Sequence, residues 1–358
     1  LIVAVWMRQW ESSSWSDSVQ DWISRVLSNY GVTQTGPYRR VTLDLAATVL
    51  EVPTEAGVLY FKATAPARSH EAEIVAKIAG HSRGHVPSPL AIAPDEGWFL
   101  SPGMGSTVTT PAADLPAEHW NRVFSDAAQL QLSLAGAAED LAEGGVPGLL
   151  PNQTAEYLDE ALTMQASLPA EHPLHISGAD ADLLSNGLAI VEEAATILAA
   201  VEIPMTLQQG TLEPSQVLVP ASTRAPLMFI GWGAARWSHP FGLIGPAVQE
   251  LCSMHACEPN QEPVRSMVAA YLEPFTHLAP AAELEEMLAP AALLAYAQRY
   301  QASMDLLMGA DPEEQAAAAP EVMRLLGTAL ATPERSSRRS AKANRPGGAA
   351  RGARRRAV

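Results

Sequence analysis

Two charged residues near the start of the chain have the types and spacing of a contact for nucleotide phosphates. Residues 58–63 read Val-Leu-Tyr-Phe-Lys-Ala, a pattern that predicts a strand on which Lys62 alternates with apolar neighbours. Glu71 opens the next predicted helix, eight residues after the strand ends. A buried lysine needs a carboxylate partner, and a lysine held in this way binds phosphates in phosphoryl transfer. Taken alone, the two residues also fit an ordinary exposed surface.

A second stretch, residues 207–232, is laid out like the phosphate-transferring face of a kinase, but Glu213 is its only carboxylate. Phosphoryl transfer needs a carboxylate that receives the substrate proton and further oxygen ligands for Mg²⁺. Two interpretations of Glu213 stand side by side. It is either a solvated loop residue, or a substitute base or metal ligand that shares one side of an extended loop with Thr211.

Several of these motifs occur in the order found in a known family. Residues 48–54, 58–63 and 70–71, then 207–219 and 229–233, together resemble the aminoglycoside phosphotransferase family, which has a protein-kinase-like fold. The likeness spans roughly residues 15–330. It implies an α+β, bilobal fold with a small mixed N-lobe and a larger helical C-lobe. It also implies ATP as the cofactor, bound next to Lys62 and Glu71, and a small hydroxylated molecule as the acceptor.

The sequence departs from the family where the chemistry takes place. The family's catalytic loop reads His-Gly-Asp-Leu-His-x-x-Asn. Here Gln209 replaces the first histidine, Thr211 the catalytic aspartate, Glu213 the second histidine and Gln216 the asparagine, while Gly231 replaces the metal-binding aspartate of the next motif. Threonine is no base at neutral pH, and glycine offers no metal ligand. The resemblance therefore implies a degenerate member in which Mg²⁺ binding is weak or lost.

Three functional hypotheses follow from these residues. The leading one is a pseudokinase that has lost phosphoryl transfer but retains weak binding of a nucleotide or small molecule, with Lys62 as the surviving contact. The second is an active but atypical ATP-dependent phosphotransferase in which Glu213 does the acid–base or metal work. The third is an interaction protein that works through its basic C-terminal tail. Fold-level likeness does not select the acceptor.

Charge is unevenly distributed along the 358 residues. Nine of the 23 basic residues, but only one of the 39 acidic ones, lie in residues 332–358, which leaves 14 basic and 38 acidic residues and a net charge of −24 before the tail. Such an acidic body repels the phosphate backbone of nucleic acids. The tail lacks apolar residues for a core, so we expect it to be disordered. It is either a plain extension or a segment that contacts nucleic acid or an anionic surface.

The elements that must position the candidate residues follow from periodicity and turn signals. We expect an N-lobe over 1–103, a C-lobe over 104–331 and the tail over 332–358, with a hinge at the Pro and Gly residues of 101–105. The N-lobe is predicted to hold helices over 17–27 and 70–79 and strands over 42–52, 57–63, 89–92 and 97–101. For the C-lobe we predict strands over 216–219 and 227–230 and helices over 120–134, 184–198, 245–254, 262–272, 281–308 (broken at Pro290) and 313–330.

Metal and membrane signals are weak. Cys252 and Cys257 bracket His255, but a zinc site needs about four ligands and there is no second cluster in the sequence, so we interpret them as two ordinary thiols. His81 and His85 are expected at the surface rather than as ligands. No apolar run approaches the roughly 20 residues that span a bilayer. We therefore expect a soluble, cytoplasmic protein without a metal centre.

Overall fold

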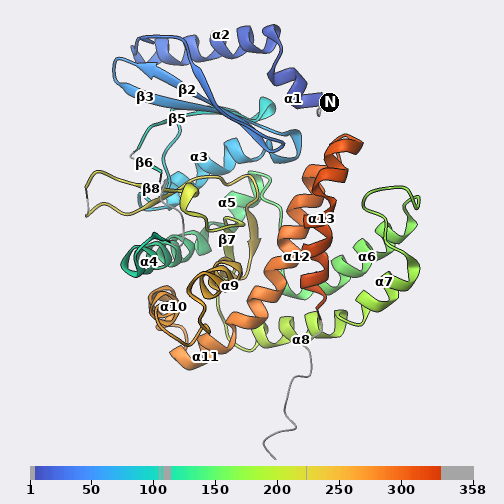
Figure 1. Cartoon of the computed structure of the whole chain (residues 1–358). Helices are drawn as coiled ribbons and strands as arrows, with labels where there is room; N and C mark the ends of the chain where they lie inside the picture. The colour runs from blue at the N-terminus through green and yellow to red at the C-terminus, as the bar shows by residue number, and fades with distance from the viewer. Residues whose placement is uncertain (1–4, 105, 108–113, 223, 332–358) are drawn as a thin grey trace, which may run out of the picture.

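A five-stranded antiparallel sheet forms the core of the small N-terminal lobe (Figure 1). The computed structural model describes residues 5–104, 106–107, 114–222 and 224–331. The strand order is β1-β2-β3-β5-β4. The strands are β1 (Arg39–Leu43), β2 (Ala47–Thr54), β3 (Gly57–Thr64), β4 (Ala91–Ala93) and β5 (Trp98–Pro102), and helix α3 (Glu71–His81) lies between β3 and β4 in the chain.

Helix α2 (Ser13–Tyr30) packs on the outer face of this sheet. Its apolar stripe recurs every four residues, at Trp15, Val19 and Ile23, and these side chains are buried together with apolar residues of β2, β3 and β5. The helix begins earlier than residue 17, where we predicted its start, because the Ser12 side chain caps it by accepting a hydrogen bond from the Trp15 amide. The short helix α1 (Val5–Trp10) was not predicted.

The strand predicted over 42–52 is two strands. β1 ends at Leu43 and β2 begins at Ala47, because Asp44 forms a turn between them. The Asp44 carboxylate accepts hydrogen bonds from the amides of Ala46 and Ala47 at 2.8 and 2.9 Å. An aspartate that bonds to its own backbone in this way ends a strand locally, and the apolar pattern on both sides conceals the turn.

The larger lobe is helical, as predicted. Its long helices α4, α12 and α13 pack against shorter ones around one continuous apolar core. Helix α6 had not been predicted. The helices are α4 (Ala117–Leu134), α5 (Ala138–Glu143), α6 (Thr154–Ser167), α7 (Gly178–Ser185), α8 (Leu188–Ala199), α9 (Ile244–His255), α10 (Val264–Leu272), α11 (Ala281–Glu286), α12 (Leu288–Leu307) and α13 (Pro312–Ala329).

Two of the predicted helices are interrupted. The stripe over 184–198 divides into α7 and α8 at Gly187, where an added Cβ would lie 2.1 Å from the carbonyl oxygen of Leu330, so only glycine allows the end of α13 to approach. The predicted break near Pro290 is confirmed: α11 ends at Glu286 and α12 begins at Leu288. Pro290 thus lies in the first turn of α12, where the missing N–H has no helical partner to lose.

Five short strands hold the loops that face the N-lobe. β7 (Thr206–Gln208) pairs with β10 (Arg236–Ser238). β8 (Val217–Val219) pairs with β6 (Ser106–Thr107) on one side and β9 (Met228–Phe229) on the other, which confirms the predicted hairpin. Residues 209–216 and 230–235 connect these strands, so the two motifs that resemble the kinase loops are anchored side by side.

The basic tail, residues 332–358, lies outside the described residues. Within the described part of the chain, no helix has both the length and the apolar character needed to cross a bilayer. The thiols of Cys252 and Cys257, at the end of α9, are half-buried and not joined in a disulfide.

Candidate functional site

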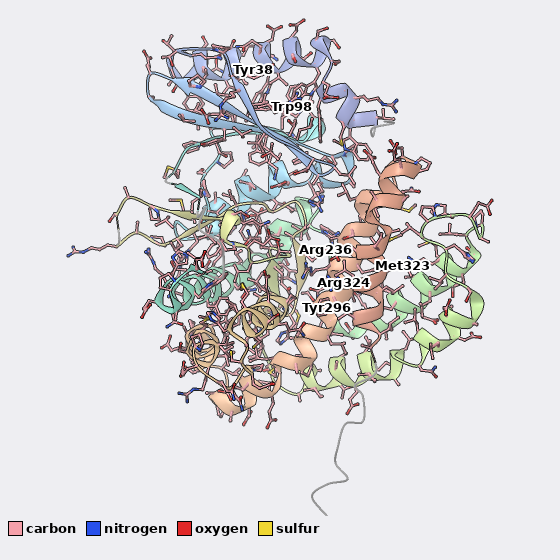
Figure 2. All side chains as sticks on the ribbon, in the orientation of Figure 1. Tyr38, Trp98, Arg236, Tyr296, Met323 and Arg324 are labelled. Carbon is pink, nitrogen blue, oxygen red and sulfur yellow. The ribbon has the colours of Figure 1, made fainter. Side chains whose placement is uncertain are left out.

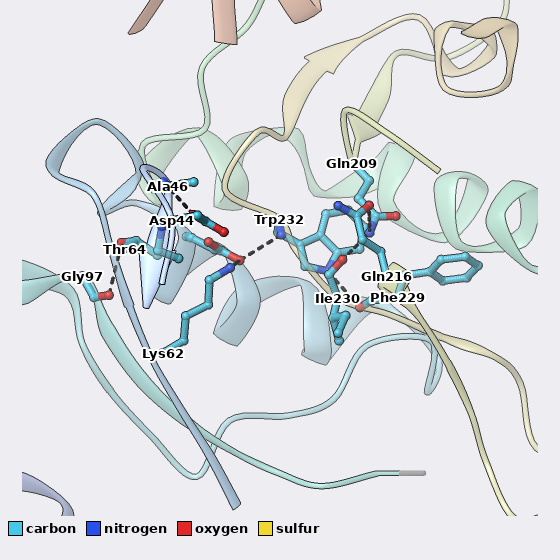
Figure 3. Close-up of polar contacts among 12 residues, drawn as sticks. Asp44, Ala46, Lys62, Thr64, Gly97, Gln209, Gln216, Phe229, Ile230 and Trp232 are labelled. Carbon is cyan, nitrogen blue, oxygen red and sulfur yellow. Dashed lines mark hydrogen bonds and ion pairs between the residues drawn. The ribbon is translucent and has the colours of Figure 1, made fainter. Parts of the chain in front are cut away.

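Lys62 and Glu71 form an ion pair across the gap between β3 and α3. The Lys62 Nζ lies 2.7 Å from Glu71 Oε1 (Figure 3). The Glu71 side chain is 1% exposed and that of Lys62 is 19% exposed, so the pair is largely withdrawn from water. Lys62 also lies over the Phe99 ring, 5.9 Å from its centre, on the neighbouring strand β5. The ammonium is therefore attracted both by the Glu71 carboxylate and by the face of this ring.

Glu71 also connects the two lobes. The backbone amide of Trp232 donates a hydrogen bond to Glu71 Oε1 at 2.9 Å. The next residue, Gly233, approaches so closely that an added Cβ would lie 2.7 Å from Glu71 Oε2. The carboxylate therefore holds the lysine of the small lobe and the loop of the large lobe at once. Glu71 and Trp232 lie in two separate sequence motifs, and neither motif indicates that they are in contact.

A cavity of about 660 Å³ opens between the sheet and the loops. Lys62 and Glu71 line one part of it, and Gln216 and Gly231 line another. Its volume falls within the range of sites for small molecules and cofactors, roughly 300–1,000 Å³. The remaining wall is largely apolar and includes Val49, Val75, Val86, Phe99, Leu218, Phe229 and Ile230.

The polar groups of the catalytic-like loop bond to one another. The Thr211 hydroxyl donates to Gln216 Oε1 at 3.1 Å. The Gln209 amide lies 3.4 Å from the same oxygen and also donates to the carbonyl of Ile230. The loop backbone turns at Gly210, which has φ +100°. The result is a closed network of uncharged groups at the position where the resemblance implies a base and metal ligands.

Gly231 completes this network by leaving room for Gln216. It has φ +83°, a backbone conformation that side chains disfavour. A Cβ at Gly231 would lie 3.3 Å from Gln216 Nε2. The Gln216 side chain thus packs against the place where a side chain at 231 would begin. Within residues 5–331 as described, no three acidic, histidine or cysteine side chains gather closely enough to hold a metal ion.

Glu213 is placed differently from the other candidates. Its side chain is exposed, and it lines neither the 660 Å³ cavity nor a second cavity of about 150 Å³ that Thr211 lines. Its backbone carbonyl accepts a hydrogen bond from the backbone N–H of Gln216 at 2.9 Å, and this bond shapes the turn. The structure therefore brings together Lys62, Glu71, Gln209, Thr211, Gln216 and Gly231, and leaves the Glu213 carboxylate at the surface.

Of three histidines near the loops, one is exposed and two are buried. His81 is exposed, as predicted, and lies 3.0 Å from Asp140. The prediction for His85 was wrong: it is 5% exposed, because its ring packs against Phe229 and its Nδ1 bonds to the carbonyl of Leu227 at 3.0 Å. His239, which follows β10, is also buried, and burial lowers its pKa to about 3. It is therefore neutral at physiological pH.

The fold recurs among solved enzymes that phosphorylate small molecules. A macrolide 2′-phosphotransferase from Brachybacterium faecium matches with a TM-score of 0.53 and 19% identity, over 84% of this chain and 96% of that one. An ethanolamine kinase from Plasmodium vivax matches with a TM-score of 0.58 and 13% identity, over 83% and 82%. A spectinomycin phosphotransferase, solved with ADP and spectinomycin, matches with a TM-score of 0.53 and 10% identity, over 87% and 97%.

The sequence itself matches no protein-family model and no curated protein. The structural likeness covers most of each chain at identities below 20%, which establishes the fold and leaves the activity open. The predicted α+β architecture is confirmed. The chain has the bilobal protein-kinase-like fold shared by macrolide and aminoglycoside phosphotransferases and by ethanolamine and choline kinases.

Proposed function

We propose that this protein is a divergent, kinase-like pseudoenzyme that binds a nucleotide between its lobes and does not carry out ordinary Mg²⁺-dependent phosphoryl transfer. One contrast carries the proposal. The Lys62–Glu71 pair lines the cavity intact, whereas the Thr211 hydroxyl and the Gln216 amide bond to each other at 3.1 Å in place of a base and a metal ligand.

The cavity offers what a nucleotide requires. A base and ribose can pack against its apolar wall, and the Lys62 ammonium can contact phosphate oxygens while Glu71 holds it in place. Four of the structural neighbours are complexes with nucleoside diphosphates, three with GDP and one with ADP. Their fold and ligands support a nucleotide as the occupant of the equivalent cavity here.

The catalytic-like loop lacks the groups that ordinary Mg²⁺-dependent phosphoryl transfer requires. A positioned general base contributes roughly 10²–10⁴-fold to a rate, and neither Thr211 nor Gln216 can take a proton at neutral pH. Mg²⁺ prefers several oxygens in octahedral geometry, carboxylates above all. The side-chain amide that lines the cavity on the loop side belongs to Gln216, and its Oε1 already accepts from Thr211. We therefore expect nucleotide binding that depends little on Mg²⁺.

The test is the thermal shift of the full chain with ATP, in EDTA and in excess Mg²⁺. We expect ATP to raise the melting temperature, and Mg²⁺ to change this shift little. Lys62→Ala should abolish the shift relative to the variant without ATP. Lys62→Arg should keep part of the shift. Lys77→Ala is the matched control, because Lys77 lies on α3, pairs with Asp140 at 2.7 Å and does not line the cavity. Its shift should equal that of the wild type.

Two outcomes would overturn the proposal. One is the absence of any ATP-dependent shift, in which case the cavity is not a nucleotide site. The other is sustained release of ADP in Mg²⁺ that Lys62→Ala abolishes, which would show an active phosphotransferase. If that activity also disappeared in Glu213→Ala, Glu213 would be the substitute base or metal ligand.

A further inference from the structure

A second cavity, of about 150 Å³, lies on the helical side of the loop, and its charge is unusual for this protein. Arg68, Arg236 and Arg299 line it, with Gly210 and Thr211 of the loop at its edge. We propose that this cavity binds a small oxyanion, either free phosphate or the phosphate or carboxylate group of a small molecule. Arg68 and Arg299 are the groups we expect to bind it.

The charge balance of the lining favours an anion. Three arginines face one carboxylate, that of Glu321, in a body whose net charge is −24. Glu321 is already engaged, since Arg324 on the next turn of α13 donates two hydrogen bonds to it, at 2.6 and 2.7 Å. Its charge is therefore largely neutralised by a residue that does not line the cavity.

Arg236 is held in place rather than available. It is 3% exposed and donates to the Asp305 carboxylate, to the Gln301 side chain and to the carbonyl of Ala235. Figure 2 shows it beside α12 and α13, below the small lobe. Its charge is balanced by the ion pair with Asp305, and its hydrogen bonds are directed into the protein, which leaves the other two arginines to bind an anion.

Arg68 and Arg299 remain available. Each is half-buried, and within the described residues neither guanidinium has a hydrogen bond or an ion pair within 4 Å. Burial lowers the pKa of Arg68, and the carboxylates of Glu71, Asp44 and Asp305 oppose this effect without forming an ion pair with it. Two guanidinium groups that line one cavity, each without a partner among the described residues, can bind an anion, because arginine offers paired N–H donors to phosphate and carboxylate oxygens.

The volume of the cavity limits the size of the ligand. Sites for drug-sized molecules measure roughly 300–1,000 Å³, so 150 Å³ accommodates one phosphate or carboxylate group with little attached to it. The cavity shares no lining residue with the 660 Å³ cavity. This inference is therefore independent of nucleotide binding, and either can fail without the other.

The experiment titrates inorganic phosphate, and separately acetate, into the full chain by calorimetry, with ionic strength held constant with NaCl. We expect phosphate to bind, Arg68→Gln to weaken it roughly tenfold or more, and Arg299→Gln to weaken it less. Glu321→Gln should strengthen binding several-fold, because it removes the opposing carboxylate. Arg25→Gln, an exposed arginine on α2, is the control and should bind as the wild type does.

The acetate arm distinguishes a carboxylate site from a phosphate site. Lys62→Ala, which alters the other cavity, should leave anion binding unchanged. The proposal is overturned if neither anion binds, if Arg68→Gln and Arg299→Gln both bind as the wild type does, or if Lys62→Ala alone removes binding. Arg299→Gln keeps the test decisive if Arg68→Gln does not fold.

Discussion

The two walls of the large cavity hold their polar groups in opposite ways. On the N-lobe side, Lys62 and Glu71 are charged, and the carboxylate has three hydrogen-bonding or close contacts, with Lys62, the Trp232 amide and Gly233. On the loop side, the lining residue Gln216 is uncharged, and its amide oxygen is within hydrogen-bonding distance of the Thr211 hydroxyl and the Gln209 side-chain amide of the same loop. One wall holds a buried pair of charges, and the other holds a network of uncharged groups.

A residue of the type found in catalytic sites, such as Glu71, does not by itself indicate catalysis. Glu71 also holds the lobes together through Trp232, so its loss would affect the fold whether or not the protein binds ATP. The loop network contains no carboxylate, and amides and a hydroxyl satisfy one another there. Charge persists where the structure depends on it.

The largest expected effect comes from removing the charged side of this comparison. Glu71→Ala leaves the Lys62 ammonium and the Trp232 amide without their partner in a largely buried place. Breaking a buried pair by removing one member typically costs about 3–5 kcal/mol, and we expect about 3 kcal/mol here because Lys62 is partly exposed. Urea unfolding measures it.

Glu73→Ala is the matched control for that prediction. Glu73 lies on the same helix, is 38% exposed and approaches Lys77 only to 4.0 Å. Exposed pairs of this kind contribute about 0–1 kcal/mol. If both variants lost similar amounts of stability, the buried pair would have no special role and the comparison would fail.

The second prediction concerns pH and the buried His239, which follows β10 behind the loops. His239 has a pKa of about 3 in the folded protein against a usual 6.5, so the unfolded chain binds one more proton between those values. Its stabilising effect is complete above pH 6.5 and decreases as pH falls towards 3. From pH 6.5 to 5 this removes about 2 kcal/mol at about 1.4 kcal/mol per unit.

The measurement compares unfolding free energies of the wild type and His239→Asn from pH 7.5 to 5. Asparagine can replace the imidazole as acceptor for the Phe241 amide, which lies 3.3 Å from Nδ1, and it does not titrate. The wild type should therefore lose about 2 kcal/mol more than the variant. Parallel pH profiles would show that His239 is not held neutral.

A third prediction introduces a carboxylate into the uncharged loop. Gly231→Asp should lower stability by about 1–2 kcal/mol, because residue 231 has φ +83° and its side chain would press on Gln216. In return, its carboxylate should make the ATP-induced thermal shift increase with Mg²⁺. Gly231→Ala brings similar backbone strain without charge, so a Mg²⁺ response in both variants would contradict the role assigned to the missing carboxylate.

The smallest expected effect is within the neutral network. Thr211→Val removes the hydroxyl that donates to Gln216 and should cost about 1 kcal/mol, while ATP binding stays unchanged. Thr211→Ser keeps the donor and should cost less. Unfolding curves and thermal shifts with ATP measure both effects. Loss of ATP binding in the valine variant alone would show that Thr211 contacts the ligand after all.

The sequence by itself determined the features that are local. The alternation around Lys62, the helix that begins at Glu71 and the loop without aspartates are short patterns, and periodicity and motif spacing reveal them. The same signals gave the two-lobed α+β architecture and the break at Pro290. They failed at the Asp44 turn, because the apolar pattern continues on both sides of it.

Only the tertiary structure decided which distant groups meet. It joined Glu71 to the Trp232 amide, 161 positions away, and buried His85 against Leu227, 142 positions away. It also placed Arg68 of the small lobe in one cavity with Arg299 of α12. Packing between lobes fixes such contacts, and no sequence period carries information about them, because each residue pattern records only its own element's buried face.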